Sequence, residues 1–176
     1  MALPDTFKVA QGTAIVWGQN GGSGVTADLS LNALADATAQ QGASVDLGAD
    51  WDREYLVYLV VETGTAPTAG NVVDLYLISS QNGTDWPAKV TGSNAAYTLG
   101  TADANLRQAG APVVSLFATN DANTVLRQAP VVWRPAGRYV APIVDNNLGQ
   151  AFRNEGTAAN NDSRVILVPL IEKVVE

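Results

Sequence analysis

The stretch that decides the fold is residues 54–87, EYLVYLVVETGTAPTAGNVVDLYLISSQNGTDWP. Two runs rich in Val, Leu, Ile and Tyr, 54–63 and 72–80, flank a segment that contains Gly, Pro and Asn, the residues that typically bound strands. In 72–80 the apolar residues alternate with a mixed set, which predicts a strand covered mainly on one face. Residues 55–61 are apolar on both faces, so we predict a central strand that is packed on both sides.

The same strand signals recur along the rest of the chain. Further runs of this kind are 13–17, 28–34, 43–47, 113–119, 124–134, 138–146 and 164–174. No segment has a convincing helical period: 31–41 is the best candidate, and the long connection 92–111 has room for one short helical turn. About eight strands with regularly spaced turns predict an all-β protein with a single β-sandwich domain.

The length and the glycines define the expected domain organisation. The chain of 176 residues is long enough for one domain with its own core. A glycine-rich hinge at residues 21–24 predicts an N-terminal arm over 1–24, followed by the sandwich over 25–176. Prolines interrupt several predicted strands, and we expect them at sheet edges or bulges. These are Pro130, Pro135, Pro142 and Pro169.

Composition argues against several classes of function. The chain has no histidine and no cysteine, which removes the commonest general base, the thiolate nucleophile and zinc–sulfur sites. Its net charge is −7 and its ten basic residues are scattered, which argues against a nucleic-acid partner. No signal peptide is visible, and the longest apolar run is too short to span a bilayer. We therefore expect a protein made in the cytoplasm, without a catalytic site, a cofactor or a membrane partner.

One acidic segment, 44–54, deserves a test as a calcium site because Asp46, Asp50, Asp52 and Glu54 lie close together. Hard cations bind several oxygen ligands from one loop, but the spacing lacks the alternating ligands and the glycine of an EF-hand. We interpret the segment as a polar turn that leads into the central strand, with Trp51 at the edge of the sandwich. No metal site is predicted.

The end of the opening stretch, SSQNGTDWP, has three interpretations. Asn82-Gly83-Thr84 is a glycosylation sequon, but without a signal peptide it is incidental. Asn82-Gly83 also suits a tight turn with positive φ, after which Trp86 folds back to close the end of the sandwich. The third interpretation makes Asn82, Gly83 and Trp86 ligand contacts. The spacing of Ser79, Gly83 and Trp86 resembles a turn of sialidase-like propellers and carbohydrate-binding sandwiches, where it mainly shapes a hairpin.

The order of segments resembles a family. The segments are VDLGADWDREYLVYLVVETGTAPTAGNVVDLYLISSQNGTDWP (45–87), NLRQAG (105–110), PAGRYVAPIVDNNLGQAF (135–152) and RVILVPLIEKVVE (164–176). Over residues 43–176 this succession resembles the small jelly-roll structural proteins of tailed bacteriophage particles. The resemblance implies a non-enzymatic virion protein, a decoration or cement protein that stabilises the outer head shell. It also implies a homotrimer on the capsid surface, with the major capsid protein and copies of itself as partners.

Two alternatives to a capsid protein remain open. A carbohydrate-binding module on a tail fibre or a bacterial surface enzyme would use SSQNGTDW and exposed tryptophans to bind a surface glycan. The tryptophans are Trp17, Trp51, Trp86 and Trp133, which otherwise fill or cap the core. A tail or baseplate adaptor could have the same sandwich, because one fold serves many roles.

Overall fold

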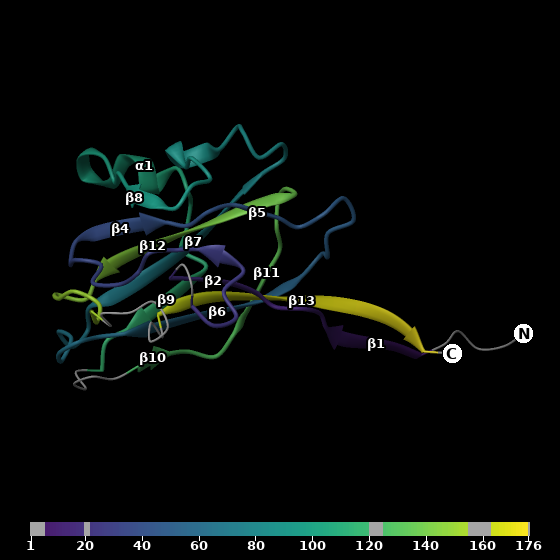
Figure 1. Ribbon diagram of the computed structural model, residues 1–176, viewed down its shortest axis with the longest axis horizontal. Helices are drawn as coiled ribbons and strands as arrows, with labels where there is room; N and C mark the ends of the chain where they lie inside the picture. Colours follow the sequence, from purple (N-terminus) through teal and green to yellow (C-terminus); the bar gives the residue numbers. More distant parts are fainter. Residues whose placement is uncertain (1–5, 20–21, 120–124, 155–162, 176) are drawn as a thin grey trace, which may run out of the picture.

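The chain folds into two β-sheets that pack face to face, as the computed structural model of residues 6–19, 22–119, 125–154 and 163–175 shows (Figure 1). The first sheet contains β1 (Thr6–Gln11), β2 (Ile15–Gly18), β3 (Ala27–Asp28), β6 (Tyr55–Glu62), β10 (Val125–Arg127), β11 (Val131–Trp133) and β13 (Arg164–Val175). The second contains β4 (Thr38–Gln41), β5 (Val45–Asp46), β7 (Val72–Ser80), β8 (Ala95–Tyr97), β9 (Val114–Phe117) and β12 (Tyr139–Asn147). The predicted all-β sandwich is confirmed.

The strand order places the two most apolar strands in the interior of the first sheet. That sheet runs β10-β6-β13-β2-β3, and the second runs β8-β4-β12-β7-β9. The prediction that 55–61 belongs to a central strand is therefore confirmed, but full packing on both sides is not, because Leu56, Tyr58 and Val60 on the outer face are only half-buried. The pairs are antiparallel except for β2 with β3, which is parallel.

The segment 28–41 differs from its prediction. The strand expected at 28–34 is mostly turn, although Leu29 and Leu31 are fully buried, and the best helix candidate ends instead in β4. β4 pairs with β12 on one side and with β8 on the other. Its alanine and glutamines are good helix formers, but propensity is a weak preference that two ladders of hydrogen bonds override, so tertiary pairing decides the conformation.

The main core lies between the sheets and follows the alternation of the strands. In β6 the residues Tyr55, Val57, Leu59 and Val61 are buried, while those between them are mostly half-buried. Facing side chains come from β7, β9 and β12 of the second sheet, and β13 and the fully buried Trp17 of β2 contribute from the same sheet as β6. Burial of alternate apolar side chains on two facing sheets is the main force that stabilises a sandwich.

A second, smaller core covers the outer face of the second sheet. The connection after β7 contains η1 (Pro87–Lys89), β8, η2 (Thr101–Asp103) and the single turn α1 (Ala104–Arg107). Its apolar residues pack on the face of β7 and β12 that points away from the main core. In the ribbon view, α1 and β8 lie on that side of the second sheet (Figure 1). The residues of this second core are Ala39, Tyr76, Ile78, Val90, Tyr97, Leu106, Ala141 and Ile143. The short helical turn expected within 92–111 is confirmed.

Two central strands contain a proline, and each proline lies beside a bulge. Pro169 of β13 accepts a hydrogen bond from the Gly12 N–H at 2.9 Å, and Pro142 of β12 accepts one from the Gly42 N–H at 2.9 Å. Beyond each glycine the register slips by one residue, which separates β1 from β2 along β13 and β4 from β5 along β12. A proline lacks the N–H of a continuous ladder, so a bulge accommodates it.

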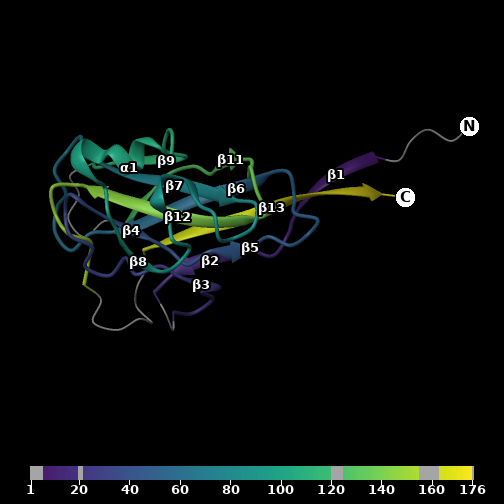
Figure 2. The ribbon, with the colours of Figure 1, turned by 90° about the horizontal axis from the view of Figure 1, so that it is seen from above.

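The most prominent departure from the sandwich is a two-stranded ribbon. β1 pairs with the second half of β13, from Thr6 opposite Val175 to Gln11 opposite Leu170. This ribbon extends beyond both sheets, and its tip lies where β1 begins and β13 ends (Figures 1 and 2). An arm was expected over 1–24, but β2 belongs to the first sheet, so the projecting part stops before Ile15.

Candidate interaction surface

The ribbon presents two open strand edges. Leu170 donates its N–H to the Glu54 carbonyl on the β6 side, while the Pro169 carbonyl accepts from Gly12 on the β1 side. The N–H and C=O groups of successive residues point to alternate sides of a strand. Because Gly12 points toward β13, the backbone groups of Phe7, Val9 and Gln11 point away from it. No backbone hydrogen bond joins this outer edge of β1 to another segment in the described part of the chain. Unpaired edges of this kind are templates for pairing with another strand.

The ribbon also carries exposed apolar surface. Val9 is 68% exposed, more than almost any other large apolar side chain in the described residues. Leu170 and Ile171, on the facing strand, are only half-buried. A two-stranded ribbon is marginally stable when it stands alone in water, since few of its apolar groups are covered. The geometry is therefore that of an element suited to being covered by a partner.

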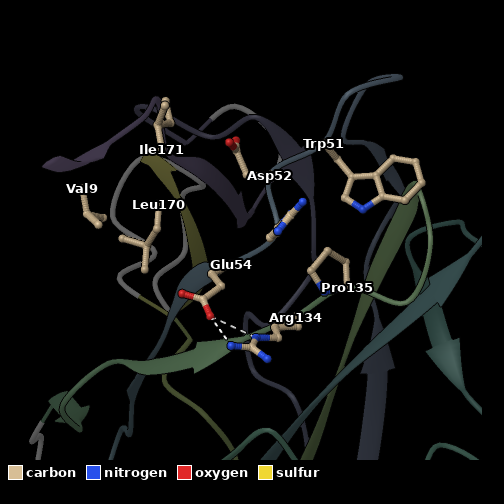
Figure 3. A pocket seen from close by; sticks show the side chains of 9 residues that line it. Val9, Trp51, Asp52, Glu54, Arg134, Pro135, Leu170 and Ile171 are labelled. Atoms are coloured by element: carbon tan, nitrogen blue, oxygen red, sulfur yellow. Dashed lines mark hydrogen bonds and ion pairs between the residues drawn. The ribbon is translucent and has the colours of Figure 1, made fainter. Parts of the chain in front are cut away.

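A pocket of about 760 Å³ lies at the base of the ribbon. Val9 and Leu170 form one side of it, and Trp51 and Pro135 lie across from them (Figure 3). The remaining lining residues are Asp52, Arg53, Glu54, Arg134 and Ile171. The loop before β6, the segment after β11 and the ribbon all meet here. Because these segments are far apart in the sequence, the pocket forms only when the chain is folded.

The charged groups of this pocket are of both signs. Arg134 donates from Nε at 3.0 Å and from Nη2 at 2.5 Å to Glu54 Oε1, and Arg134 remains largely exposed. The lining contains no hydroxyl, thiol or imidazole that could act as a nucleophile or general base at neutral pH. Its mixture of exposed charges and apolar side chains suits the polar rim of a protein interface.

The acidic segment tested for calcium forms ion pairs instead. Arg138 donates to both carboxylate oxygens of Asp46, each at 2.6 Å, and Glu54 is held by Arg134. The Arg138 hydrogen bonds, with one from the Gly48 N–H, lower the pKa of Asp46 to about 2. Among the described residues there is no group of three or more carboxylates that could hold a metal ion.

The sequence-predicted residues Asn82, Gly83 and Trp86 do come together, in a turn after β7. Asn82 Oδ1 accepts from the backbone N–H of Thr84 at 3.0 Å and of Asp85 at 2.9 Å. Gly83 has a φ of +76°, and its carbonyl accepts from Trp86 Nε1 at 3.0 Å. The polar atoms of the turn thus satisfy one another, which is the arrangement of a structural turn.

Two details of that turn differ from the expectation. β7 does not pair with the next strand, β8, which pairs with β4, so the turn does not close a hairpin. Trp86 packs against the second core on the outer face of the sheet and does not close the end of the sandwich. The cause is the covering connection that follows η1: it offers Trp86 apolar contacts that a simple hairpin would lack.

The four tryptophans do not form a common platform. Trp17 is fully buried in the main core, and its Nε1 donates to the Ala43 carbonyl at 2.7 Å. Trp133 packs against the main core, Trp86 against the second core, and Trp51 lines the pocket at the ribbon. Sugar-binding platforms require aromatic faces that are exposed side by side.

The sequence analysis singled out Trp51, Asp52 and Glu54 of this surface but missed the ribbon. The region of Val9 was assigned to an arm without secondary structure, and 164–174 was treated as an ordinary core strand. A signal was present, since TFKVAQ alternates apolar and polar residues in the first half. Pairing between the first and last strands of a chain is not visible in either segment alone.

A second open edge lies on the opposite side of the sandwich. β9 ends the second sheet and β10 ends the first, and a groove of about 410 Å³ lies between them. Phe117 of β9 borders this groove and is 68% exposed. The groove lies between the edges of the two sheets, whereas the ribbon projects beyond the region where the sheets face each other.

The chain has no match among protein families, curated proteins or solved structures. In the part of the chain that the structure describes, no helix is long and apolar enough to cross a membrane.

Proposed function

We propose that this protein is a non-enzymatic structural component of a bacteriophage particle, a decoration or cement protein that binds the outer head shell and stabilises it. The observation that carries the proposal is the projecting ribbon, with its open edges and exposed Val9, on an otherwise well-packed sandwich. An element of this kind gains stability when a neighbouring chain covers it. A particle surface supplies such neighbours at fixed positions.

The strand order supports the jelly-roll type that the family resemblance implies. Eight strands form two four-stranded orders, β2-β13-β6-β10 and β4-β12-β7-β9. The chain changes sheet at most steps, and β7 and β9 are consecutive members of the same sheet. Jelly rolls combine two Greek keys in this manner and recur in capsid proteins and lectins.

The surface chemistry supports assembly as the role. Charged residues make up 15% of the chain, and no histidine or cysteine is present to supply acid–base or thiol chemistry. In the pocket at the ribbon, the Glu54–Arg134 pair and the apolar side chains offer contacts without a reactive group. Specific interfaces of about 1,000 Å² or more combine an apolar centre with a polar rim in this way.

The partners in this proposal are the shell protein and further copies of the chain, in the trimer that the resemblance implies. Light scattering on the purified protein tests the copy number, with a trimer as the expected result. A monomer at every concentration would contradict self-association in solution, although assembly on the shell itself would still be tested by the particle experiments below.

A glycan-binding role is less well supported by the geometry. Trp86 Nε1 is already bonded to the Gly83 carbonyl, and a Cβ on Gly92 would lie only 3.1 Å from the indole, so this edge of the half-buried ring is closely packed. The tryptophans also lie in separate places. Loss of binding on a glycan array after Trp86→Ala would favour this role over the structural one.

Mass spectrometry of purified particles tests the proposal directly. We expect the protein in mature particles at a copy number that matches a repeating site on the head, and cryo-electron microscopy should place its density outside the shell. Absence from mature particles would refute a virion role. Density confined to the tail or baseplate would identify an adaptor instead of a head decoration protein.

A further inference from the structure

We propose that the ribbons of two copies pair edge to edge through β1 about a two-fold axis at Val9, forming a four-stranded sheet between molecules. This inference rests on the proposed assembly role and names the partner of the ribbon as a second copy of the same chain. The ribbon has two open edges, and the outer edge of β1 (Thr6–Gln11) is the longer one. Three residues of β1 direct their backbone groups outward, whereas only two residues of β13 do so.

The register of the pairing follows from the backbone. Phe7, Val9 and Gln11 direct their N–H and C=O groups away from β13, so only these residues can form hydrogen bonds with a neighbouring strand. Within β1, a single antiparallel register pairs all three: Phe7 faces Gln11 of the second copy, Val9 faces Val9, and Gln11 faces Phe7. Registers centred on Lys8 or Ala10 pair only two.

The side chains at the centre of this register are complementary. Val9 is 68% exposed in the single chain, and the two-fold axis places it beside the same residue of the second copy. Val9 and Leu170 line the same side of the pocket at the ribbon base (Figure 3). Pairing therefore brings the apolar patches of the two copies together. In a contact with two-fold symmetry both copies use the same surface, so no second kind of surface is needed.

The pairing extends the ladder without disturbing either chain. The N–H groups of Lys8 and Ala10 remain directed at β13, so the ribbon keeps its own hydrogen bonds. A contact along one short strand buries less than the about 1,000 Å² of a stable interface, so it is weak in free solution. On a particle surface the effective concentration is high, and two-fold contacts can link trimers that occupy neighbouring three-fold positions.

A cysteine scan tests the register, because the chain contains no cysteine of its own. In the proposed pairing the two Val9 Cα atoms lie about 5.5 Å apart, within the range of about 4.4–6.8 Å that a disulfide requires. Concentrated Val9→Cys protein should therefore form disulfide-linked dimers under mild oxidation. The two Gln11 Cα atoms lie about 14 Å apart along the strands, so Gln11→Cys should remain monomeric on a non-reducing gel.

A proline variant provides the second arm of the test. Val9→Pro removes an N–H that points outward, so it leaves the ladder to β13 in place and removes a bond to the second copy. Sedimentation at high concentration should show weaker self-association for Val9→Pro than for the wild type. Circular dichroism confirms for each variant that the sandwich has folded.

Three outcomes would overturn the pairing: equal cross-linking of Val9→Cys and Gln11→Cys, no cross-linking of either folded variant, or unchanged association of Val9→Pro. If Val9→Cys cross-links in particles only to a different protein, the occupant of the edge is a shell strand and the second copy is excluded. Because the cysteine scan and the proline test use the purified chain, they can fail while mass spectrometry still finds the protein in particles, and the reverse also holds.

Discussion

At the scale of single residues, the most unusual environment is that of Asp145 in β12. It is 6% exposed, its direct cross-strand partner in β7 is another acid, Asp74, and its Oδ1 has no hydrogen-bond partner among the described residues. The pKa of Asp145 is raised to about 6: burial is the main cause, the charges of Asp74 and Asp103 add to it, and a hydrogen bond from Asn147 opposes it. Burial, with the same three acids nearby, also raises the pKa of Tyr76 to about 12.

This environment predicts a pH-dependent stability. The pKa of Asp145 is higher in the folded protein than its ordinary value of 3.8, so folding favours the protonated carboxyl. The stability that depends on this proton is complete below pH 3.8 and is lost as the pH rises through about 6, by up to about 3 kcal/mol. Asp145→Asn cannot ionise, so the variant should gain stability over the wild type between pH 4 and pH 8, measured by urea unfolding.

Asp50→Asn is the matched control, because Asp50 is exposed in the loop before β6. Its free energy of unfolding should follow the wild type across the same pH range. A constant difference between the wild type and Asp145→Asn at all pH values would show that the Asp145 carboxyl does not change its ionisation in this range.

Gly83 is the second residue with a specific prediction. Its φ is +76°, and a Cβ added there would lie 3.1 Å from the ring of Tyr139. A β-branched residue resists this backbone conformation and meets the ring, so Gly83→Val should lower the free energy of unfolding by about 1–3 kcal/mol. Thermal unfolding followed by circular dichroism measures the change.

Gly110→Val separates the strain of the backbone conformation from the contact with the Tyr139 ring. Gly110 also has a positive φ, +87°, but a Cβ there would meet nothing within 4 Å. This control should therefore show the backbone strain alone and a smaller loss than Gly83→Val. An unchanged melting temperature for Gly83→Val would contradict the assignment of Gly83 to a strained turn.

At the scale of elements, the bulge beside Pro169 explains how the long strand β13 belongs both to the sandwich and to the ribbon. β13 pairs with β6 and β2 in its first half and with β1 in its second half, and Pro169 lies at the change. The bulge opposite Pro169 breaks the ladder between β1 and β2, and bulges increase the local twist of a strand. The sheet can therefore continue into a ribbon that leaves the plane of the sandwich.

Gly12→Ala should loosen the ribbon and leave the sandwich intact. An added Cβ would lie 2.7 Å from Pro169 Cγ and 2.8 Å from Ile171 Cδ1, which forces the strands apart. Hydrogen exchange should therefore become faster at the amides of Lys8 and Ala10, which face β13. The amides of β6 and β12 should exchange as slowly as in the wild type.

Gly64→Ala is the matched control for that substitution. A Cβ on Gly64 would lie 3.7 Å from the Arg153 Cα, an ordinary van der Waals contact. Exchange at the ribbon amides should not change in this control. If Gly12→Ala gives the same ribbon exchange as Gly64→Ala, the close contact with Pro169 does not restrain the ribbon.

At the scale of the whole molecule, the proposed function assigns stability to the sandwich and binding to the ribbon. The main core between the sheets includes Trp17, and among the described side chains it does not include Val9 or Ala10 of β1. The ribbon lies outside this core, with its edges open. Removal of β1 should therefore affect association far more than folding.

Deletion of residues 1–11 tests this division. The truncated chain should still unfold in a single cooperative transition, because the main core keeps its strands. It should no longer co-sediment with particles that lack the full-length protein, whereas the full-length chain should bind them. Normal particle binding by the truncated chain would contradict a role for the ribbon in attachment.

The sequence by itself determined the fold class and the interior strands. The apolar runs 72–80 and 55–61 are local patterns, and local patterns are sufficient to predict strands. They did not predict which faces are covered: the second core covers the outer face of β7, whereas the outer-face residues of β6 are only half-buried. The positive φ at Gly83 and the short helical turn within 92–111 were also predictable from local chemistry. The same local view led to a helix candidate at 31–41, since it could not include the pairing of β4 with β12 and β8.

Only the tertiary structure decided where the candidate interaction surface lies. The ribbon joins residues near one end of the chain to residues near the other, and the pocket at its base joins Val9 and Leu170 to Trp51 and Arg134. The ionisation of Asp145 likewise depends on Asp74 across the sheet. Contacts between residues far apart in sequence depend on which strands become neighbours, and the periodicity of each strand does not specify its neighbour.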